Sequence, residues 1–247
     1  MQNLLGLIGY PLSHSFSKKY FQEKFVKEGI ENFNYELFPL SALTDFPALL
    51  AKHPNLRGLN VTIPYKEAII SYLDELHPAA QAIGAVNTIL LQNNKKIGYN
   101  TDYIGFLQSL KNWLAGEKIR QALILGTGGA SKAVQTALAS LGIAFVLVSH
   151  SGKGKAYQDI DAPLMQSCQL IINTSPLGMY PQNETLPDIP YHWLSNRHYV
   201  YDLVYNPPET LLLQKAKKQG AKTKNGLEML YLQAEAAWKI WQGKIVS

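Results

Sequence analysis

The chain has 247 residues, of which 47% are hydrophobic and 17% charged, and its formal net charge is +5. This composition excludes a disordered chain and allows one large domain or two modest ones, long enough to form real cores. No apolar run is long enough to cross a bilayer, the N-terminus lacks the basic start of a signal peptide, and Cys168 is the only cysteine. We therefore expect a cytoplasmic protein with no membrane contact, no internal disulfide and no metal site.

Strand-like and helix-like patterns alternate along the first hundred residues, which predicts an α/β fold with largely parallel strands. The first strand is predicted at residues 4–9, and a helix through Phe21 and Phe25 is predicted to stop at Gly29. The later elements are a strand at 35–38, a helix from Ser41 to about Lys52, a strand at 56–62, a helix beginning at Pro64, and strands at 87–91 and 97–99 around a hairpin turn at 93–96.

The same alternation continues in the second half. It predicts a helix at about 102–114, a strand at 122–125, a helix at 130–141 that ends before Gly142, strands at 145–148, 170–173 and 199–203, and a final helix from Leu227. The final helix carries a stripe of apolar side chains: Leu227, Leu230, Tyr231, Ala234, Trp238 and Trp241. Because the large aromatics need a surface to bury against, we expect this helix to pack on the first domain.

These patterns predict a two-domain α/β protein. The first is an N-terminal α/β substrate domain with a mixed sheet, formed by residues 1–103 and completed by 227–247. The second is a Rossmann-like dinucleotide-binding domain at 104–226.

Two predicted strand-to-helix corners carry charged side chains. Lys66 closes the run Asn60-Val61-Thr62-Ile63-Pro64-Tyr65-Lys66, and Asp102 lies in Gly98-Tyr99-Asn100-Thr101-Asp102-Tyr103-Ile104-Gly105. Open α/β sheets bind ligands at the carboxyl ends of their strands, so the two residues can form an acid–base pair over a small polar molecule. Considered alone, Lys66 is expected to be a solvated helix residue, and Asp102 an acid at a helix start, where the helix dipole favours negative charge.

The turn Gly126-Thr127-Gly128-Gly129-Ala130 follows a strand and opens a helix, as a dinucleotide-binding turn requires. Gly126 permits the tight turn, and Gly128 lets a pyrophosphate approach the N-terminus of the helix. With Gly129 and Ala130, these residues form the predicted cofactor site. The third small position of the motif is Ser131 instead of glycine.

The next strand ends at Ser149-His150-Ser151, where an NAD-binding unit would carry an acid for the ribose hydroxyls. Hydroxyls together with the following Lys153 and Lys155 would attract a 2′-phosphate, so the sequence favours NADP and leaves NAD possible. Residues 104–226 hold 12 basic and 7 acidic side chains, while the rest of the chain holds 11 of each. No base-reading motif accompanies this surplus, so we expect a polyphosphate cofactor and no nucleic acid.

Hydroxyl side chains gather in residues 9–17, between the first strand and the first helix. Hydroxyls placed there, with the free N–H groups of the helix, form a site for a carboxylate or a phosphate. Ser15 and Ser17 can face one ligand, although a single serine at this position also serves as a helix N-cap. Asn87 at a strand start can hydrogen-bond a hydroxyl, and Tyr205 at a strand end can donate to a carboxylate.

In this order, the motifs resemble those of the shikimate dehydrogenase family, and the similarity runs from Gly9 to Gln233. It covers the serine-rich segment 9–17, the lysine motif 60–66, the aspartate motif 98–105, and the segments 173–179 and 225–230. The resemblance implies that Lys66 and Asp102 are the catalytic pair and that Ser15 and Ser17 hold a substrate carboxylate. It also implies substrate contacts from Thr62, Asn87, Tyr205 and Gln233, and cofactor contacts from Thr174 and Gly226.

The chain departs from the family at two places. Lys18 stands where the family has proline, and Ser149-His150-Ser151 replaces Asn-Arg-Thr, which removes a bidentate partner for a phosphate. At this second place His150 could stack on adenine, and Lys153 or Lys155 could reach the phosphate.

The resemblance implies NADPH-dependent reduction of 3-dehydroshikimate to shikimate, a step toward chorismate and the aromatic amino acids. The expected partners are these small molecules, and the expected state is a monomer or a homodimer. One alternative is a quinate/shikimate dehydrogenase of broader specificity. Another is a non-catalytic sensor that binds the metabolite or the nucleotide, although a sensor needs no acid–base pair.

Overall fold

The structure is a computed structural model that describes residues 2–12 and 15–244, so Ser13 and His14 of the serine-rich segment lie outside the described residues. The chain forms two compact units, unit 1 (Met1–Thr101 with Ala234–Ser247) and unit 2 (Asp102–Gln233). The second boundary falls inside the last helix, α8 (Leu227–Trp241), seven residues beyond the predicted position. The reason is that the first turns of α8 pack within unit 2, where Met229 joins a buried core.

Unit 1 contains a mixed sheet. Its strands are β1 (Asn3–Gly9), β2 (Phe33–Pro39), β3 (Leu56–Val61), β4 (Glu75–Leu76), β5 (Thr88–Gln92) and β6 (Lys95–Tyr99), in the order β2-β1-β3-β5-β6-β4. β1 pairs in parallel with β2 and β3, whereas β5 runs antiparallel to both of its neighbours. The antiparallel hairpin confirms the predicted turn, because Asn93 and Asn94 adopt φ of 53° and 58°, a left-handed conformation that asparagine tolerates.

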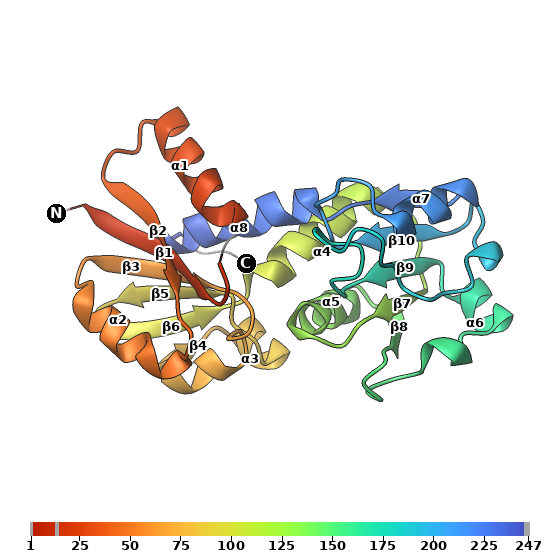
Figure 1. Cartoon of the computed structure of the whole chain (residues 1–247), viewed down its shortest axis with the longest axis horizontal. Helices are drawn as coiled ribbons and strands as arrows, with labels where there is room; N and C mark the ends of the chain where they lie inside the picture. Colours follow the sequence, from red (N-terminus) through yellow and green to blue (C-terminus); the bar gives the residue numbers. More distant parts are fainter. Residues whose placement is uncertain (1, 13–14, 245–247) are drawn as a thin grey trace. The chain divides into compact units, whose positions relative to one another are not determined.

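Helices cover both faces of this sheet (Figure 1). They are α1 (Phe16–Glu28), α2 (Phe46–Lys52), α3 (Pro78–Ile83) and the end of α8, with short 3-10 segments at Leu43–Asp45 and Ala68–Tyr72. Side chains alternate along β1, so that Leu4 and Ile8 join the core that includes Phe46 of α2, while Leu5 and Leu7 join the core beneath α1 and α8.

The end of α8 packs against the sheet of unit 1 through its aromatic side chains, as predicted. Trp238 and Trp241 are buried, and the Trp241 indole donates to the carbonyl of Ile89 at 3.0 Å. The prediction that the apolar stripe of α8 is buried from its first residue is wrong, because the side chains of Leu227 and Tyr231 are 40% and 44% exposed.

Two predicted helix starts in unit 1 are also wrong. Ser41 begins no helix, since a 3-10 segment precedes α2. Pro64 lies in a turn, and the helical residues after it form only the 3-10 segment Ala68–Tyr72. The buried Tyr65 explains the second case, because its hydroxyl donates to the carbonyl of Leu40 at 2.6 Å and ties the turn to the end of β2. This long-range contact overrides the local helix signal.

Unit 2 contains an all-parallel sheet, which confirms the Rossmann-like prediction. Its strands are β7 (Gln121–Leu125), β8 (Ala144–Val148), β9 (Leu170–Asn173), β10 (Tyr199–Asp202) and β11 (Lys222–Lys224), in the order β11-β10-β9-β7-β8. Its helices are α4 (Thr101–Leu114), α5 (Gly129–Ser140), α6 (Ala162–Ser167) and α7 (Leu211–Lys218), with 3-10 segments at Tyr157–Asp159 and Tyr191–Trp193.

The strand order places a topological switch point between β7 and β9, the position where open parallel sheets bind ligands. The sheet has a buried core on each face. One includes Leu123 of β7 and Leu212 of α7, and the other includes Ile124 of β7 and Val134 of α5. Within the part of the chain that the structure describes, no helix is both long enough and apolar enough to span a membrane.

Candidate active site

In unit 1 the segments that follow β1 and β3 are held together by backbone hydrogen bonds. Tyr10 N–H donates to the Ile63 carbonyl at 3.1 Å, and Thr62 N–H donates to the Ile8 carbonyl at 2.9 Å. Gly9 allows this approach, because a Cβ there would lie 2.4 Å from the Thr62 methyl group. The serine-rich segment and the lysine motif therefore begin side by side at the carboxyl edge of the parallel strands, where the predicted residue Thr62 lies.

Ser15 is the N-cap residue of α1, with extended backbone (φ −79°, ψ 118°), but its side chain does not cap the helix. Its Oγ is buried and has no hydrogen-bond partner among the described residues. Such buried polar atoms are rare in folded proteins and call for an explanation, such as a ligand. The nearby departure from the family is harmless to the helix, since α1 begins at Phe16 and Lys18 pairs with Glu36 at 2.6 Å.

Ser17 lies in the first turn of α1 and is half-buried. Tyr35 of β2, a residue that the sequence did not single out, has a buried phenol that donates to Asn60 Oδ1 at 2.8 Å. Asn60 Nδ2 lies 3.2 Å from Thr88 Oγ1. Thr88 Oγ1 contacts Thr101 Oγ1 at 3.1 Å. A continuous buried chain of polar groups therefore links Tyr35 of β2 to the first residue of α4.

Asn87 binds the start of α4 directly. It is 3% exposed, its Oδ1 accepts from Thr101 N–H at 2.6 Å, and its Nδ2 donates to Thr101 Oγ1 at 3.0 Å. Asp102 is the next residue, in the first turn of α4. Asn87 therefore holds Thr101, the residue before Asp102, and its contact with a substrate hydroxyl stays a prediction.

Lys66 is half-buried, and its carbonyl accepts from Val86 N–H at 2.7 Å, which holds it beside the start of β5. Asp102 is also half-buried. Lys66 belongs to unit 1 and Asp102 to unit 2, and their pairing stays a prediction.

Within unit 2, α4 lies close to the start of α8. Gly105, one turn after Asp102, permits this, because a Cβ there would lie 2.7 Å from the Met229 carbonyl and 2.9 Å from Gln233 N. Gln233 is half-buried and its amide donates to the Leu230 carbonyl at 2.9 Å. The structure thus brings the predicted residue Gln233 near the first turns of α4.

The glycine turn lies at the switch point of the parallel sheet. Gly126 has φ of +109°, a backbone conformation that favours glycine. A Cβ there would also lie 2.8 Å from Thr174 Oγ1, so the space around this residue requires glycine as well. Gly128 faces open space and is the N-cap of α5, which begins at Gly129 and continues through Ala130. The first N–H groups of α5 therefore have room for a pyrophosphate. Thr174 donates its hydroxyl proton to the Leu125 carbonyl at 2.9 Å, which joins the ends of β7 and β9.

Beside this turn, three hydroxyls form a chain. Thr127 Oγ1 lies 3.2 Å from Ser151 Oγ, which lies 2.9 Å from Ser149 Oγ. Lys153 and Lys155 follow, both exposed and without an ion-pair partner among the described residues. This arrangement of donors and cations fits a ribose phosphate.

His150 stacks on Tyr157, with ring centroids 4.5 Å apart and an angle of 26° between the planes. One face of the imidazole is therefore covered by the protein. The residue as a whole is exposed, so stacking on adenine through the other face stays a prediction.

At the end of β10 the chain turns sharply toward α8. A Cβ on Gly226 would lie 2.0 Å from the Leu203 carbonyl oxygen, so only glycine allows this crossing. Tyr205 follows two residues after Leu203, and burial raises the pKa of its phenol, which keeps it protonated as a hydrogen-bond donor.

The corner at the end of β10 also contains Asp202, whose role the sequence did not reveal. Its carboxylate is fully buried and accepts from Thr210 Oγ1 at 2.5 Å, Asn173 Nδ2 at 2.9 Å and Val204 N–H at 3.0 Å. Burial raises the pKa of Asp202 to about 6, against the opposing effect of these hydrogen bonds. Asp202 therefore holds the ends of β9 and β10 and the start of α7 together.

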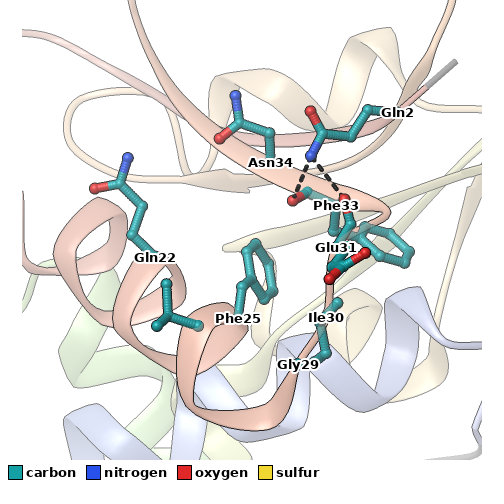
Figure 2. A pocket seen from close by; sticks show the side chains of 9 residues that line it. Gln2, Gln22, Phe25, Gly29, Ile30, Glu31, Phe33 and Asn34 are labelled. Atoms are coloured by element: carbon teal, nitrogen blue, oxygen red, sulfur yellow. Dashed lines mark hydrogen bonds between the residues drawn. The ribbon is translucent and has the colours of Figure 1, made fainter.

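A separate open hollow of about 530 Å³ lies in unit 1 between the end of α1 and the start of β2 (Figure 2). Amide and aromatic side chains line it, and Gln2 Nε2 donates to the carbonyls of Glu31 and Phe33 at 2.9 and 3.2 Å. It lies at the amino ends of the parallel strands and contains none of the predicted site residues. The serine-rich segment lies at the opposite ends of these strands.

Comparisons with known proteins bear on both units. The family model described as the shikimate dehydrogenase substrate binding domain matches residues 7–89. A curated NADP(+) shikimate dehydrogenase from Methanococcus maripaludis is 40% identical over 258 residues, which is 97% of this chain and 92% of that protein.

Two solved structures are similar along nearly the whole chain. One is a shikimate dehydrogenase in complex with NADP+, with a TM-score of 0.88 and 37% identity, covering 98% of this chain and 90% of the other. The second is a quinate dehydrogenase from Corynebacterium glutamicum in complex with NAD, with a TM-score of 0.88 and 27% identity, covering 98% of this chain and 94% of the other.

Proposed function

This chain belongs to the shikimate dehydrogenase family, and we propose that it catalyses the NADPH-dependent reduction of 3-dehydroshikimate to shikimate. It is an oxidoreductase that acts on a CH–OH group, and the step leads toward chorismate and the aromatic amino acids. The observation that carries the proposal is the glycine turn, which lies at the switch point of a parallel sheet and opens a helix whose N-terminus has room for a pyrophosphate.

NADP fits the residues of unit 2. Gly126, Gly128, Gly129 and Ala130 form the turn for the pyrophosphate. The hydroxyls of Ser149 and its neighbours, with Lys153, are suited to the 2′-phosphate, and His150 offers one open ring face. Thr174 joins the ends of β7 and β9 at the switch point, and Gly226 allows the close crossing after β10. When bound, NADPH supplies the hydride.

The substrate carboxylate is held by hydroxyl donors. Ser15 offers a buried hydroxyl that no protein group uses, and Ser17 lies two residues away in the first turn of α1. Tyr205 contributes a protonated phenol. Thr62, Asn87 and Gln233 contact the ring hydroxyls. Fixed donors of this kind orient the substrate so that its carbonyl faces the cofactor.

Lys66 and Asp102 provide the proton that the ring carbonyl oxygen takes up. As the ring carbonyl is reduced, its oxygen gains negative charge, and the Lys66 ammonium donates a proton to it. Asp102 orients the lysine and favours its charged form. This interaction develops in the transition state, so it raises kcat more than it tightens substrate binding.

The test is a spectrophotometric assay of shikimate oxidation with NADP and, separately, with NAD. We expect Lys66→Ala to lower kcat by about 10²- to 10⁴-fold while the KM for shikimate changes little. Lys52→Ala, at an exposed lysine of the same unit, serves as the matched control and should leave both constants unchanged. An unchanged kcat in Lys66→Ala would remove Lys66 from the mechanism.

A second candidate is a quinate/shikimate dehydrogenase of broader specificity, favoured by the likeness to the quinate dehydrogenase. Comparing kcat/KM for quinate and shikimate separates the two, and we expect shikimate to be preferred. Binding of either small molecule without any turnover would instead indicate a sensor. We further propose a cytoplasmic location, where NADPH is available, and a monomer or homodimer as the working state.

A further inference from the structure

We propose that the fold fixes the Asn87 side chain as a hydrogen-bond donor toward the substrate ring, and that Thr88 is a positioning residue that holds it in that orientation. The inference deepens the proposed function and rests on it, because it requires Asn87 to contact a ring oxygen. Asn87 and the groups that bind it all lie in unit 1.

Strand pairing fixes the backbone of Asn87 on both sides. Its N–H donates to the Tyr99 carbonyl at 3.1 Å, and its carbonyl accepts from Val61 N–H at 2.8 Å. The residue is 3% exposed, so solvent has little access to its amide. The side chain therefore starts from a fixed point, and its polar atoms depend on protein groups or on a ligand.

One backbone N–H decides which way the Asn87 amide faces. Thr101 N–H can only donate, and it lies 2.6 Å from Asn87 Oδ1. The amide oxygen must therefore face this N–H, because the flipped amide would bring two donors together. In this orientation Asn87 Nδ2 donates to Thr101 Oγ1 at 3.0 Å.

Thr88 places a second donor beside the same oxygen. Asn60 Nδ2 lies 3.3 Å from the Asn87 carbonyl oxygen, which can only accept, so the Asn60 nitrogen faces this strand. The Asn60 nitrogen also donates to Thr88 Oγ1 at 3.2 Å. Thr88 is fully buried and accepts there, so it can direct its own proton to Asn87 Oδ1, which lies 3.2 Å away.

The count of protons on Asn87 then gives its role. Its Oδ1 lies within reach of three protein donors, because the Thr101 hydroxyl is also 3.2 Å away, and it needs nothing from a ligand. Its Nδ2 carries two protons and gives one to Thr101 Oγ1. The second proton has no acceptor among the residues that the structure describes. A ring group of the substrate that meets Asn87 must therefore accept this proton.

Two substitutions of Asn87 test the direction of this hydrogen bond. At pH 8 the side chain in Asn87→Asp is a carboxylate that offers acceptors and no donor, whereas Asn87→Ala offers neither. We expect both variants to raise the KM for shikimate at least about fivefold, with the aspartate no better than the alanine. A lower KM in Asn87→Asp than in Asn87→Ala would overturn the proposal, because Asn87 would then act as an acceptor.

Thr88→Val removes the hydroxyl and keeps the volume of the side chain. We expect the KM for shikimate to rise about threefold, while kcat and the KM for NADP stay within about twofold, and Thr88→Ser should restore the KM. The matched control is Ser109→Ala in unit 2, which removes another fully buried hydroxyl, one that accepts from Tyr201 at 2.8 Å. The control should lower thermal stability and leave the KM for shikimate unchanged.

The outcomes separate this inference from the proposed function. An unchanged KM in Thr88→Val, or a raised KM that Thr88→Ser does not restore, would show that the Thr88 hydroxyl does not position Asn87. If the wild-type chain oxidises shikimate and the Asn87 variants keep its KM, the Asn87 role fails while the proposed function stands. A wild-type chain that does not oxidise shikimate refutes the function itself, and this inference with it.

Discussion

Buried polar side chains at the ends of strands hold segments of this protein together by hydrogen bonds. Asp202, at the end of β10, accepts hydrogen bonds from three different segments, and Asn87, before β5, binds the first residue of α4. Both side chains are buried, so their polar atoms must be satisfied by protein groups. These contacts determine where the segments after the strands begin.

Asp202 should make stability depend on pH. Its folded-state pKa is about 6, above the ordinary value of 3.8, so the folded chain binds this proton more tightly than the unfolded chain. The contribution is therefore fully present below about pH 4 and is lost as the pH rises through about 6, by ~1–3 kcal/mol at most. Asp202→Asn cannot titrate, so its stability relative to wild type should be lower at pH 5 than at pH 7.5.

Urea unfolding at both pH values measures this difference. Asp45→Asn, at an exposed carboxyl, is the control and should follow the wild-type pH dependence. An identical pH dependence in wild type and Asp202→Asn would show that Asp202 is not the titrating group.

For a single residue, the sequence shows the residue type but not its hydrogen-bond partner in the folded protein. The glycine turn was predictable, since Gly126 and Gly128 stand at fixed positions in a local motif. The hydrogen bonds of the buried Tyr35 and Asp202 were not, because their partners Asn60 and Asn173 are 25 and 29 residues away. Ser15 was predictable as a helix-start hydroxyl, but only the structure shows that it leaves the helix uncapped.

Among the elements, α1 and the end of α8 are joined by a largely buried ion pair. Lys24 Nζ lies 2.8 Å from Glu235 of α8 and 2.7 Å from Glu28 of α1, and its side chain is only 8% exposed. Tyr20 also hydrogen-bonds to Glu235. Because α1 begins at the serine-rich segment, this contact ties that segment to the last helix.

Breaking this pair should have asymmetric effects on stability. Glu235→Gln leaves the Lys24 ammonium in a buried place with Glu28 as its remaining charged partner, so we expect a loss of ~2–3 kcal/mol. Lys24→Met keeps the aliphatic packing and leaves only the partly exposed Glu235, so we expect ~1 kcal/mol. Urea denaturation measures both.

The exposed pair Lys19–Glu23, at 3.8 Å on the same helix, provides the control. Lys19→Met should change the free energy of unfolding by less than about 0.5 kcal/mol. A larger loss in Lys24→Met than in Glu235→Gln would contradict the argument from desolvation.

Element prediction succeeded where a pattern was long or strongly apolar. The strand at 170–173 and the helix after the glycine turn were located correctly, because Leu170-Ile171-Ile172 is continuously apolar and α5 repeats small and apolar residues over three turns. α3 and β4 were missed because they span six and two residues, too few for a period to show. The edge strand β11 reads Lys-Thr-Lys and forms only through pairing with β10.

Across the whole molecule, the alternation of strands and helices was enough to predict two α/β sheets, and the aromatic side chains of α8 were enough to assign its end to unit 1. The position of the second boundary was not predictable. It depends on Gly105 and Met229 meeting across two helices, which no local pattern encodes.

The excess of basic over acidic side chains lies entirely in residues 104–226. Several of these lysines have local partners, since Lys217 pairs with Glu209, Lys222 with Glu117 and Lys224 with Glu228. Lys153 and Lys155 have no such partner in the described parts of the chain. Of the twelve basic residues in this range, Lys153 and Lys155 are the two that follow the hydroxyl chain at the end of β8.

This distribution predicts a salt dependence that distinguishes the two cofactors. Salt screens exposed charges, and each exposed pair with a phosphate contributes up to ~1 kcal/mol, so raising NaCl from about 0.05 to 0.3 M should raise the KM for NADP roughly threefold. NAD lacks the 2′-phosphate, and its KM should change less. In Lys153→Ala/Lys155→Ala the KM for NADP should already be raised at low salt and should respond weakly to added salt. Equal salt responses for NADP and NAD in the wild-type protein would show that these lysines do not bind the phosphate.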